Sequence, residues 1–143
     1  MVLMLLVLQG EFCIWNKNVV KVICKAKFQY WILLYCCFSS LNFNTFIAMV
    51  YAPCAEANKK CLWKSIAYEL VHLVDPILLI GDFNQVLRPS ERSSGHLSST
   101  RVRNFKLLID SLSLLGLILN GRKYTWRNSS FYSRIDGALV SNH

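Results

Sequence analysis

No hydrophobic run in the sequence is long enough to cross a lipid bilayer, although 54% of the 143 residues are apolar. The longest runs, MVLMLLVL at 1–8 and YWILLYCCF at 30–38, fall well short of the roughly 18–20 residues that a spanning helix needs. The first run lacks a basic stretch before it, and Gln9-Gly10-Glu11 is a poor cleavage site, so no signal peptide is expected. We therefore expect two buried strands in an intracellular protein, nuclear or cytoplasmic, with no membrane partner.

The sequence also lacks the cysteine spacing of zinc-binding or secreted proteins. Its 6 cysteines include no CxxC pair and no regular disulfide pattern, which predicts reduced, mostly buried thiols. Internal repeats, low-complexity tracts and linker-like segments are absent as well. The chain is therefore expected to be one domain or part of one, long enough to bury a core.

Acidic residues are scarce, since 8 Asp and Glu face 16 Lys and Arg and the net charge is +8. The basic residues are spread along the chain rather than gathered in a tail. Such a balance suits a phosphate-rich partner or an anionic surface. Ordinary solubilising charge is the alternative, and charge alone does not decide between them.

The first third of the chain carries the β-branched and aromatic residues that are typical of strands. The expected strands cover residues 2–8, 11–15, 19–24, 28–38 and 44–51. A helical period follows, with apolar residues at Leu62, Ile66, Leu70 and Leu73/Val74 and with Lys59, Lys60, Lys64 and Glu69 off this stripe. Pro76 is expected to end the helix, and Ile77–Ile80 then reads as an interior strand.

The second half predicts a loop, a helix and two strands. The loop spans residues 84–100, and the helix begins at a cap on Ser99 or Thr100 with a buried stripe at Val102, Phe105, Leu108/Ile109 and Leu112. Gly116 and Asn120-Gly121 are expected to break the structure before strands at Tyr124–Trp126 and Arg134–Val140, joined through Asn128-Ser129-Ser130. This order of elements predicts layered α/β sheets.

The stretch LLIGDFNQV, residues 78–86, places polar residues directly after the interior strand. In open α/β sheets, sites lie beyond the carboxyl ends of such strands, and Asp82 and Asn84 occupy that place. A carboxylate there can accept a proton from attacking water, while an amide can donate a hydrogen bond to a phosphate oxygen. Gly81 lets backbone or substrate approach closely. The alternative is an Asp-turn at the end of a strand.

Four motifs in this order, VYAP (50–53), LLIGDFN (78–84), GRKYTW (121–126) and SRID (133–136), resemble the endonuclease/exonuclease/phosphatase family. More narrowly, they are similar to the endonuclease domain of plant LINE-type (non-LTR) retrotransposon polyproteins. The resemblance is strongest over residues 44–141 and extends to CIW, CLW and ER at 13–15, 61–63 and 91–92. It implies a four-layer α/β sandwich, two stacked, mainly antiparallel sheets flanked by helices, that cleaves DNA with Mg²⁺.

The resemblance also implies a role for each matching residue. Asp82 would activate or align the attacking water, Asn84 would bind the scissile phosphate, and Tyr51 would contact that phosphate or assist the leaving oxygen. Asp136 would hold a catalytic histidine in its correct tautomer. The reaction would be an in-line attack by water, with a hard cation neutralising the developing charge.

Cations interleave with aromatic residues near the end of the chain, which predicts contacts with DNA. The residues expected to make these contacts are Arg122, Lys123, Tyr124, Trp126, Arg127 and Arg134. A strand with aromatic residues inside and cations outside needs no DNA and remains the alternative. Arg88, Arg92, Arg101 and Arg103 are a further basic run that could steer phosphate or simply be solvated. His72 is expected to be structural, and His96 to be a solvated loop residue.

Two motifs of the resembled family are missing from the sequence. The first is an early strand with Asn and a metal-binding Glu in a Gln-Glu-Thr-like context, and Glu11 is not assigned to that role. The second is Ser-Asp-His, for which Ser141-Asn142-His143 follows Asp136 too closely. We therefore expect a domain that is truncated at both ends, inactive in catalysis and prone to self-association through exposed sheet edges. An active endonuclease, a catalytically dead nucleic-acid-binding remnant and a phosphatase or lipid phosphodiesterase all remain open.

Overall fold

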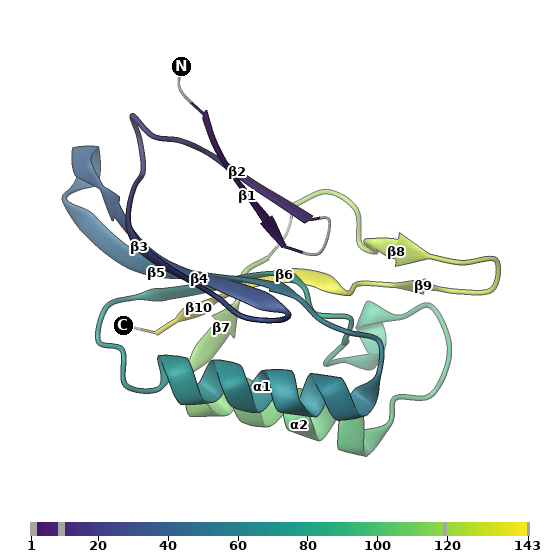
Figure 1. The fold of residues 1–143 in the computed structure, drawn as a ribbon. Helices are drawn as coiled ribbons and strands as arrows, with labels where there is room; N and C mark the ends of the chain where they lie inside the picture. The colour runs from purple at the N-terminus through teal and green to yellow at the C-terminus, as the bar shows by residue number, and fades with distance from the viewer. Residues whose placement is uncertain (1–2, 9–10, 119, 143) are drawn as a thin grey trace.

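The computed structural model describes residues 3–8, 11–118 and 120–142 (Figure 1). The strands are β1 (Leu3–Leu8), β2 (Glu11–Asn16), β3 (Lys21–Lys27), β4 (Trp31–Phe38), β5 (Phe43–Tyr51), β6 (Ile77–Asp82), β7 (Leu114–Gly116), β8 (Trp126–Arg127), β9 (Tyr132–Ser133) and β10 (Asp136–Ser141). The helices are α1 (Glu56–Leu70) and α2 (Ser99–Ser111), and the 3₁₀ helices are η1 (Ser39–Leu41) and η2 (Pro89–Glu91).

Six strands form the central sheet in the order β3-β4-β5-β6-β10-β7. β5 and β6 run parallel with α1 between them in the chain, and the other neighbours in this sheet are antiparallel. The pairs β1–β2 and β8–β9 form two small antiparallel sheets of their own. The mixed α/β class with mainly antiparallel sheets is therefore confirmed.

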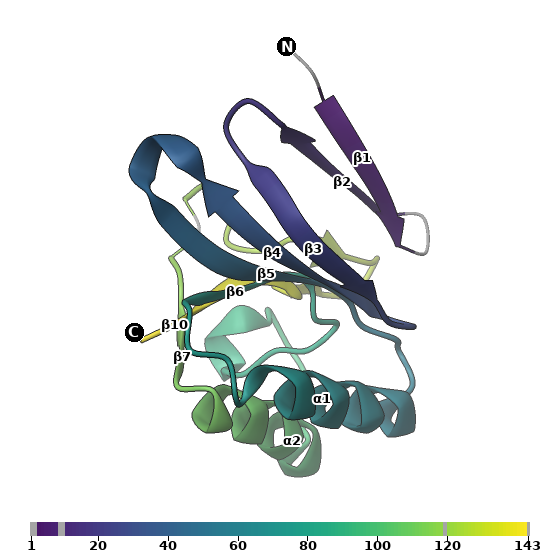
Figure 2. The ribbon, with the colours of Figure 1, turned by 60° about the vertical axis from the view of Figure 1, so that its left-hand side comes forward.

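The elements are arranged in layers. α1 and α2 lie side by side on one face of the six-stranded sheet, and the β1–β2 hairpin lies on the opposite side (Figure 1 and Figure 2). The described residues thus supply helices, a large sheet and a small sheet, which are three of the four layers that the resemblance implies. The polar loop after β6 and the β8–β9 hairpin lie at one end of this arrangement.

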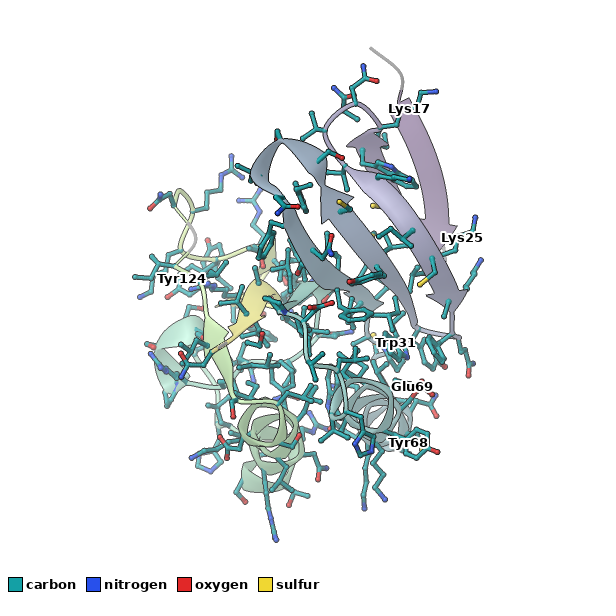
Figure 3. All side chains as sticks on the ribbon, turned by 90° about the vertical axis from the view of Figure 1, so that its left-hand side faces the viewer. Lys17, Lys25, Trp31, Tyr68, Glu69 and Tyr124 are labelled. Carbon is teal, nitrogen blue, oxygen red and sulfur yellow. The ribbon has the colours of Figure 1, made fainter. Side chains whose placement is uncertain are left out.

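The main core lies between the large sheet and the helices. Leu62, Ile66 and Leu70 of α1 are buried there, as the helical period predicted. Trp31 of β4 is also buried, between the sheet and α1 (Figure 3), and its Nε1 donates a hydrogen bond to Ser65 Oγ of α1 at 3.3 Å. The first helix is therefore held to the sheet by apolar burial and by a satisfied indole N–H.

The predicted end of the first helix was wrong. α1 stops at Leu70. Of the two residues expected to end its buried stripe, Leu73 packs against the core and Val74 is 86% exposed. Pro76 already belongs to the sheet, because its carbonyl oxygen accepts hydrogen bonds from Phe46 N and Thr45 Oγ1, each at 2.8 Å. The chain must leave the helix early enough to reach this position beside β5.

The predicted ends of other elements also need correction. The first residue of α2 is Ser99, but its N-cap is Ser98, which makes no side-chain cap hydrogen bond. Gly116 is the last residue of β7, where it pairs with Leu139, so the strand ends at this glycine as expected. The strand expected over 19–24 is shifted to Lys21–Lys27.

The end of the chain forms a hairpin and a separate strand instead of two long strands. β8 and β9 pair with each other, and Arg134 and Ile135 leave β9 before β10 begins. The backbone explains this break, because Arg134 N donates to Glu91 O at 2.8 Å and Ile135 O accepts from Phe83 N at 2.9 Å. These two residues therefore bond to the segment that follows β6.

The exposure of the thiols corrects the expectation that they are mostly buried. Of the six free cysteines only Cys36 is fully buried, and three of them, Cys24, Cys54 and Cys61, are exposed. Burial raises the pKa of the Cys36 thiol to about 11. Within the described residues no helix is both long enough and apolar enough to span a bilayer.

Candidate active site

Three residues singled out by the motifs occupy one row across the central sheet. Asp82 at the end of β6 pairs with Tyr51 of the parallel strand β5 and with Asp136 of the antiparallel strand β10. Side chains at directly paired positions lie on the same face of a sheet. All three line a cavity of about 650 Å³ on the face beside the β1–β2 hairpin. The fold thus brings together residues that lie far apart in the sequence.

Gly81 is required by the close approach of β5 to β6. Its φ is +139°, and a Cβ at this position would lie 2.0 Å from the carbonyl oxygen of Val50. No side chain can occupy that space without moving the neighbouring strand. The sequence predicted that backbone or substrate approaches Gly81 closely. In the structure it is the backbone of β5 that does so.

Asp82 and Asn84 form a tight turn. The Asn84 N–H donates to Asp82 Oδ1 at 2.7 Å, and Asn84 adopts a left-handed conformation with φ of +47°. The alternative of an Asp-turn is therefore confirmed as local structure. It does not exclude a functional role, because Asn84 Nδ2 projects from the turn and donates to Cys54 Sγ at 3.1 Å. Both side chains line a cleft.

This cleft has a volume of about 510 Å³ and lies where the loops after β5 and β6 meet the β8–β9 hairpin. Tyr51, Asp82 and Asn84 line it together with Trp126. Its cationic lining residues are Lys59, Arg92 and Arg101, and the side chains of Cys54 and His96 also line it. Apart from Asp82, the charged groups of this lining are thus positive, which suits a phosphate ligand.

Aromatic packing fixes the loop that carries the turn. Phe83 is buried, and its ring centroid lies 5.2 Å from that of Phe105 in α2 and 6.4 Å from that of Trp63 in α1. Trp63 and Phe105 are themselves 4.7 Å apart. Phe83, the middle residue of Asp-Phe-Asn, therefore packs against both helices, while Asp82 and Asn84 on either side of it line the cleft.

Glu91 organises the segment between the turn and α2. Its Oε2 accepts the N–H of Leu87 at 2.7 Å and that of Arg88 at 3.3 Å. Ser93 N then donates to Tyr132 O at 3.0 Å, which joins this segment to the β8–β9 hairpin. In the Glu-Arg motif at 91–92, Glu91 thus stabilises the segment, and this places Arg92 at the cleft.

Arg92 lies against an aromatic ring of the hairpin. Its Cζ is 4.9 Å from the ring centroid of Phe131, and Phe131 packs against Trp126 at 5.7 Å. Its Nε is buried and has no hydrogen-bond partner in the described part of the chain. One wall of the cleft is therefore both cationic and aromatic.

The residues predicted to contact DNA are not gathered in one place. Trp126 lines the cleft and is 41% exposed, whereas Arg122, Lys123 and Arg127 are exposed outside its lining. Arg134 turns away from it and donates from Nη2 to Leu117 O at 3.3 Å. Their contacts with DNA remain predictions.

The expected strand with aromatic residues on one side was wrong. Only Trp126 and Arg127 of this segment are in β8. Tyr124 lies outside that strand and stacks on Tyr132, with ring centroids 5.8 Å apart, while Lys123 Nζ lies 5.2 Å from the Tyr124 ring centroid. The segment is therefore shaped by ring contacts with the returning strand.

Lys59 is a functional candidate whose predicted position was wrong. It was expected on the solvated side of the helix, but it is only 5% exposed and its ammonium group reaches the segment after β6. The signal was present, since Lys59 precedes Leu62, Ile66 and Leu70 at the spacing of a single helix face. The charge of lysine nevertheless favours an exposed position, which is why the sequence predicts the solvated side.

The histidines do not complete a catalytic set in the described residues. His96 is exposed and lines the cleft, and His72, expected to be structural, is exposed near the end of α1. His143 lies outside the described residues. The histidine-orienting role of Asp136 is therefore still a prediction.

The donor set can be tested against a magnesium ion. The described residues contain no group of three or more His, Cys, Asp and Glu side chains that could hold a metal. Asp82 and Asp136 nevertheless place two carboxylates on adjacent strands. Mg²⁺ is commonly held by one or two carboxylates together with phosphate oxygens and water. The residues present fit an ion that binds together with a phosphate group.

No protein-family model and no curated protein matches the sequence. Solved structures do resemble the chain. An endonuclease/exonuclease/phosphatase from Bacteroides vulgatus is 12% identical with a TM-score of 0.65, over 94% of this chain and 60% of that one. An AP endonuclease from Archaeoglobus fulgidus is 14% identical with a TM-score of 0.57, over 76% and 52%.

A mannosyl-6-phosphatase from Bacteroides thetaiotaomicron is 14% identical with a TM-score of 0.58, over 90% of this chain and 55% of that one. The chain thus spans somewhat more than half the length of these three structures. It has the endonuclease/exonuclease/phosphatase fold. Since proteins with different substrates share this fold, the site has to decide the function.

Proposed function

We propose that the chain is a Mg²⁺-dependent phosphodiesterase domain that acts on DNA. The observation that carries this proposal is the row of Tyr51, Asp82 and Asp136, which lies beside a cleft with a cationic lining. A carboxylate pair next to cations suits a substrate that brings its own negative charge.

Each side chain has a defined task in the proposed reaction. Asp82 aligns the attacking water and accepts its proton, Asn84 donates its amide to a phosphate oxygen, and Tyr51 assists at the leaving oxygen. Arg101 attracts the phosphate into the cleft. Asp82 and Asp136 would hold Mg²⁺, which would neutralise the charge that develops on the phosphate. In this proposal Asp136 serves the metal in place of the histidine-orienting role that the resemblance implies.

The motifs also support a more specific origin. The set VYAP, LLIGDFN, GRKYTW and SRID resembles the endonuclease domain of LINE-type retrotransposon polyproteins, and it favours DNA over a phosphosugar or lipid substrate. The Bacteroides phosphatase with the same fold shows why this choice needs a test.

A second candidate is DNA binding without cleavage. Arg92 and Arg101 in the lining of the cleft can attract a phosphate, whichever chemistry follows. The sequence also lacks the two family motifs that would supply a further metal ligand and a histidine. Such a binder would retain its affinity for DNA when Asp82 is replaced.

The test is the relaxation of supercoiled plasmid by the purified, monomeric chain with Mg²⁺ or with EDTA. Nicking that requires Mg²⁺ and is abolished in Asp82→Ala supports the nuclease, provided that Asp110→Ala, an exposed carboxylate of α2, leaves it unchanged. Retained binding without nicking in a folded chain supports the second candidate. Hydrolysis of a phosphomonoester but not of plasmid would overturn both.

A further inference from the structure

Lys59 has no role in the proposed chemistry, yet its ammonium group is buried beside the candidate site. It extends from the first turns of α1 and is 5% exposed. Lysine is almost never buried to this extent unless its charge is paired. Its burial therefore calls for specific partners, and the structure supplies them.

Three acceptors surround Lys59 Nζ. Glu56 Oε1 lies 2.6 Å away, the carbonyl oxygen of Asn84 2.9 Å away, and Gln85 Oε1 3.4 Å away. An ammonium group has three N–H donors and no acceptor. All three donors are thus committed within the protein, so Lys59 is not placed to bind a phosphate although it lines the cleft.

The carbonyl that Lys59 holds belongs to the residue whose side chain faces the cleft. Asn84 is in the left-handed conformation, which costs free energy for any residue with a Cβ and persists where its surroundings stabilise it. Its N–H is fixed by Asp82 and its carbonyl by Lys59, so both polar groups of its backbone are held. These two contacts hold the backbone of Asn84 in place, and its side chain makes its own contact from Nδ2 to Cys54 Sγ at 3.1 Å.

We propose that Lys59 is a positioning residue that fixes Asn84 for contact with the phosphate. The proposal rests on the proposed function, because Asn84 binds phosphate only in that reaction. Lys59 acts by clamping the turn from the helix side, and Glu56 completes the clamp by neutralising the buried charge.

The same carboxylate links the clamp to a second helix. Glu56 Oε1 also lies 3.4 Å from Arg101 Nε of α2, whose side chain is 58% exposed. The starts of α1 and α2 and the turn after β6 therefore share one network of charges. Arg101 stays exposed at the cleft, where it can contact the substrate, while Lys59 holds the carbonyl oxygen of Asn84.

A double-mutant cycle tests whether Lys59 acts through Asn84. Lys59→Met keeps the apolar stem and removes the three donors, and Lys60→Met at the next, exposed position is the matched control. We expect Lys59→Met to lower kcat for plasmid nicking by about 10- to 100-fold, as loss of an orienting contact does, with little change in KM. In an Asn84→Ala background the same change should cost nothing further. Additive losses would overturn the proposal.

Amide hydrogen exchange tests the clamp without relying on cleavage. The protection of the Asn84 N–H should fall in Lys59→Met and stay unchanged in Lys60→Met, with the core of α1 equally protected in both. Lys59→Arg retains a charged donor, and it should restore protection and nicking in part if Lys59→Met does not fold well. Unchanged protection at Asn84 in a folded variant would overturn the proposal. A wild-type chain that shows this pattern but neither nicks nor binds DNA would contradict the proposed function alone.

Discussion

Asp136 lies directly opposite Asp82 in the antiparallel pairing of β10 with β6. Like charges at paired positions destabilise a sheet by about 0.2–1 kcal/mol, so two carboxylates here work against the stability of the fold. A bound cation would reverse the sign of this interaction. The pair is therefore the place in the sheet where the proposed metal would change the stability of the fold.

Asp136→Asn tests this link through thermal unfolding. In EDTA the variant should unfold at the same temperature as the wild type or about 1–3 °C above it, because a repulsion is removed. With Mg²⁺ the wild type should gain stability by binding the ion, and the variant should not. Asp110→Asn on α2 is the control. An equal gain with Mg²⁺ in Asp136→Asn would contradict the assignment of the pair to the metal.

Replacement of Gly81 should show how much the close approach of β5 and β6 matters. Gly81→Ala combines a φ of +139° with a Cβ only 2.0 Å from Val50 O, and we expect a loss of more than about 3 kcal/mol in the free energy of unfolding. Gly121→Ala shares a positive φ of +113° but has no atom within 4 Å of its Cβ. It should lose about 1–2 kcal/mol in urea unfolding. Equal losses would mean that the clash is relieved by a small shift of β5.

The salt dependence of DNA binding separates a cleft contact from general charge. Arg101 lines the cleft, whereas Arg103 is exposed on the same helix and does not. Arg101→Ala should reduce the slope of log affinity against log salt concentration by about 1, as loss of one phosphate contact does. Arg103→Ala should change the slope less. Equal changes in both variants would indicate that DNA binds along the helix surface and not in the cleft.

The thiols should differ in reactivity because of their burial. Cys54 and Cys61 are exposed and should be alkylated quickly at pH 8, while Cys36 should react only on unfolding. Burial raises the pKa of Cys36 from 9.0 to about 11, so the folded chain retains this proton where the unfolded chain loses it. The free energy of unfolding should therefore fall as the pH rises from about 9 to 11. Mass spectrometry of alkylated peptides and urea unfolding across this range, with Cys36→Ala as the control, check both results.

The sequence by itself determined the α/β class and the position of the turn that carries Asp82 and Asn84. Alternating and fully apolar runs report which side chains are buried, and these patterns depend only on local geometry. The burial of one face of α1, with Leu62, Ile66 and Leu70, could be predicted for the same reason. The motifs also indicated which polar residues belong together, though not how they meet.

Only the tertiary structure decided how the site is assembled. The pairing of Asp82 with Tyr51 and Asp136 depends on the order and register of three strands, which local patterns do not encode. Lys59 is buried because the carbonyl oxygen of Asn84, in the loop after β6, accepts its hydrogen bond. Arg134 lies outside β10 because its N–H donates to Glu91 O. These features arise because distant segments satisfy one another's polar groups once the sheet has formed.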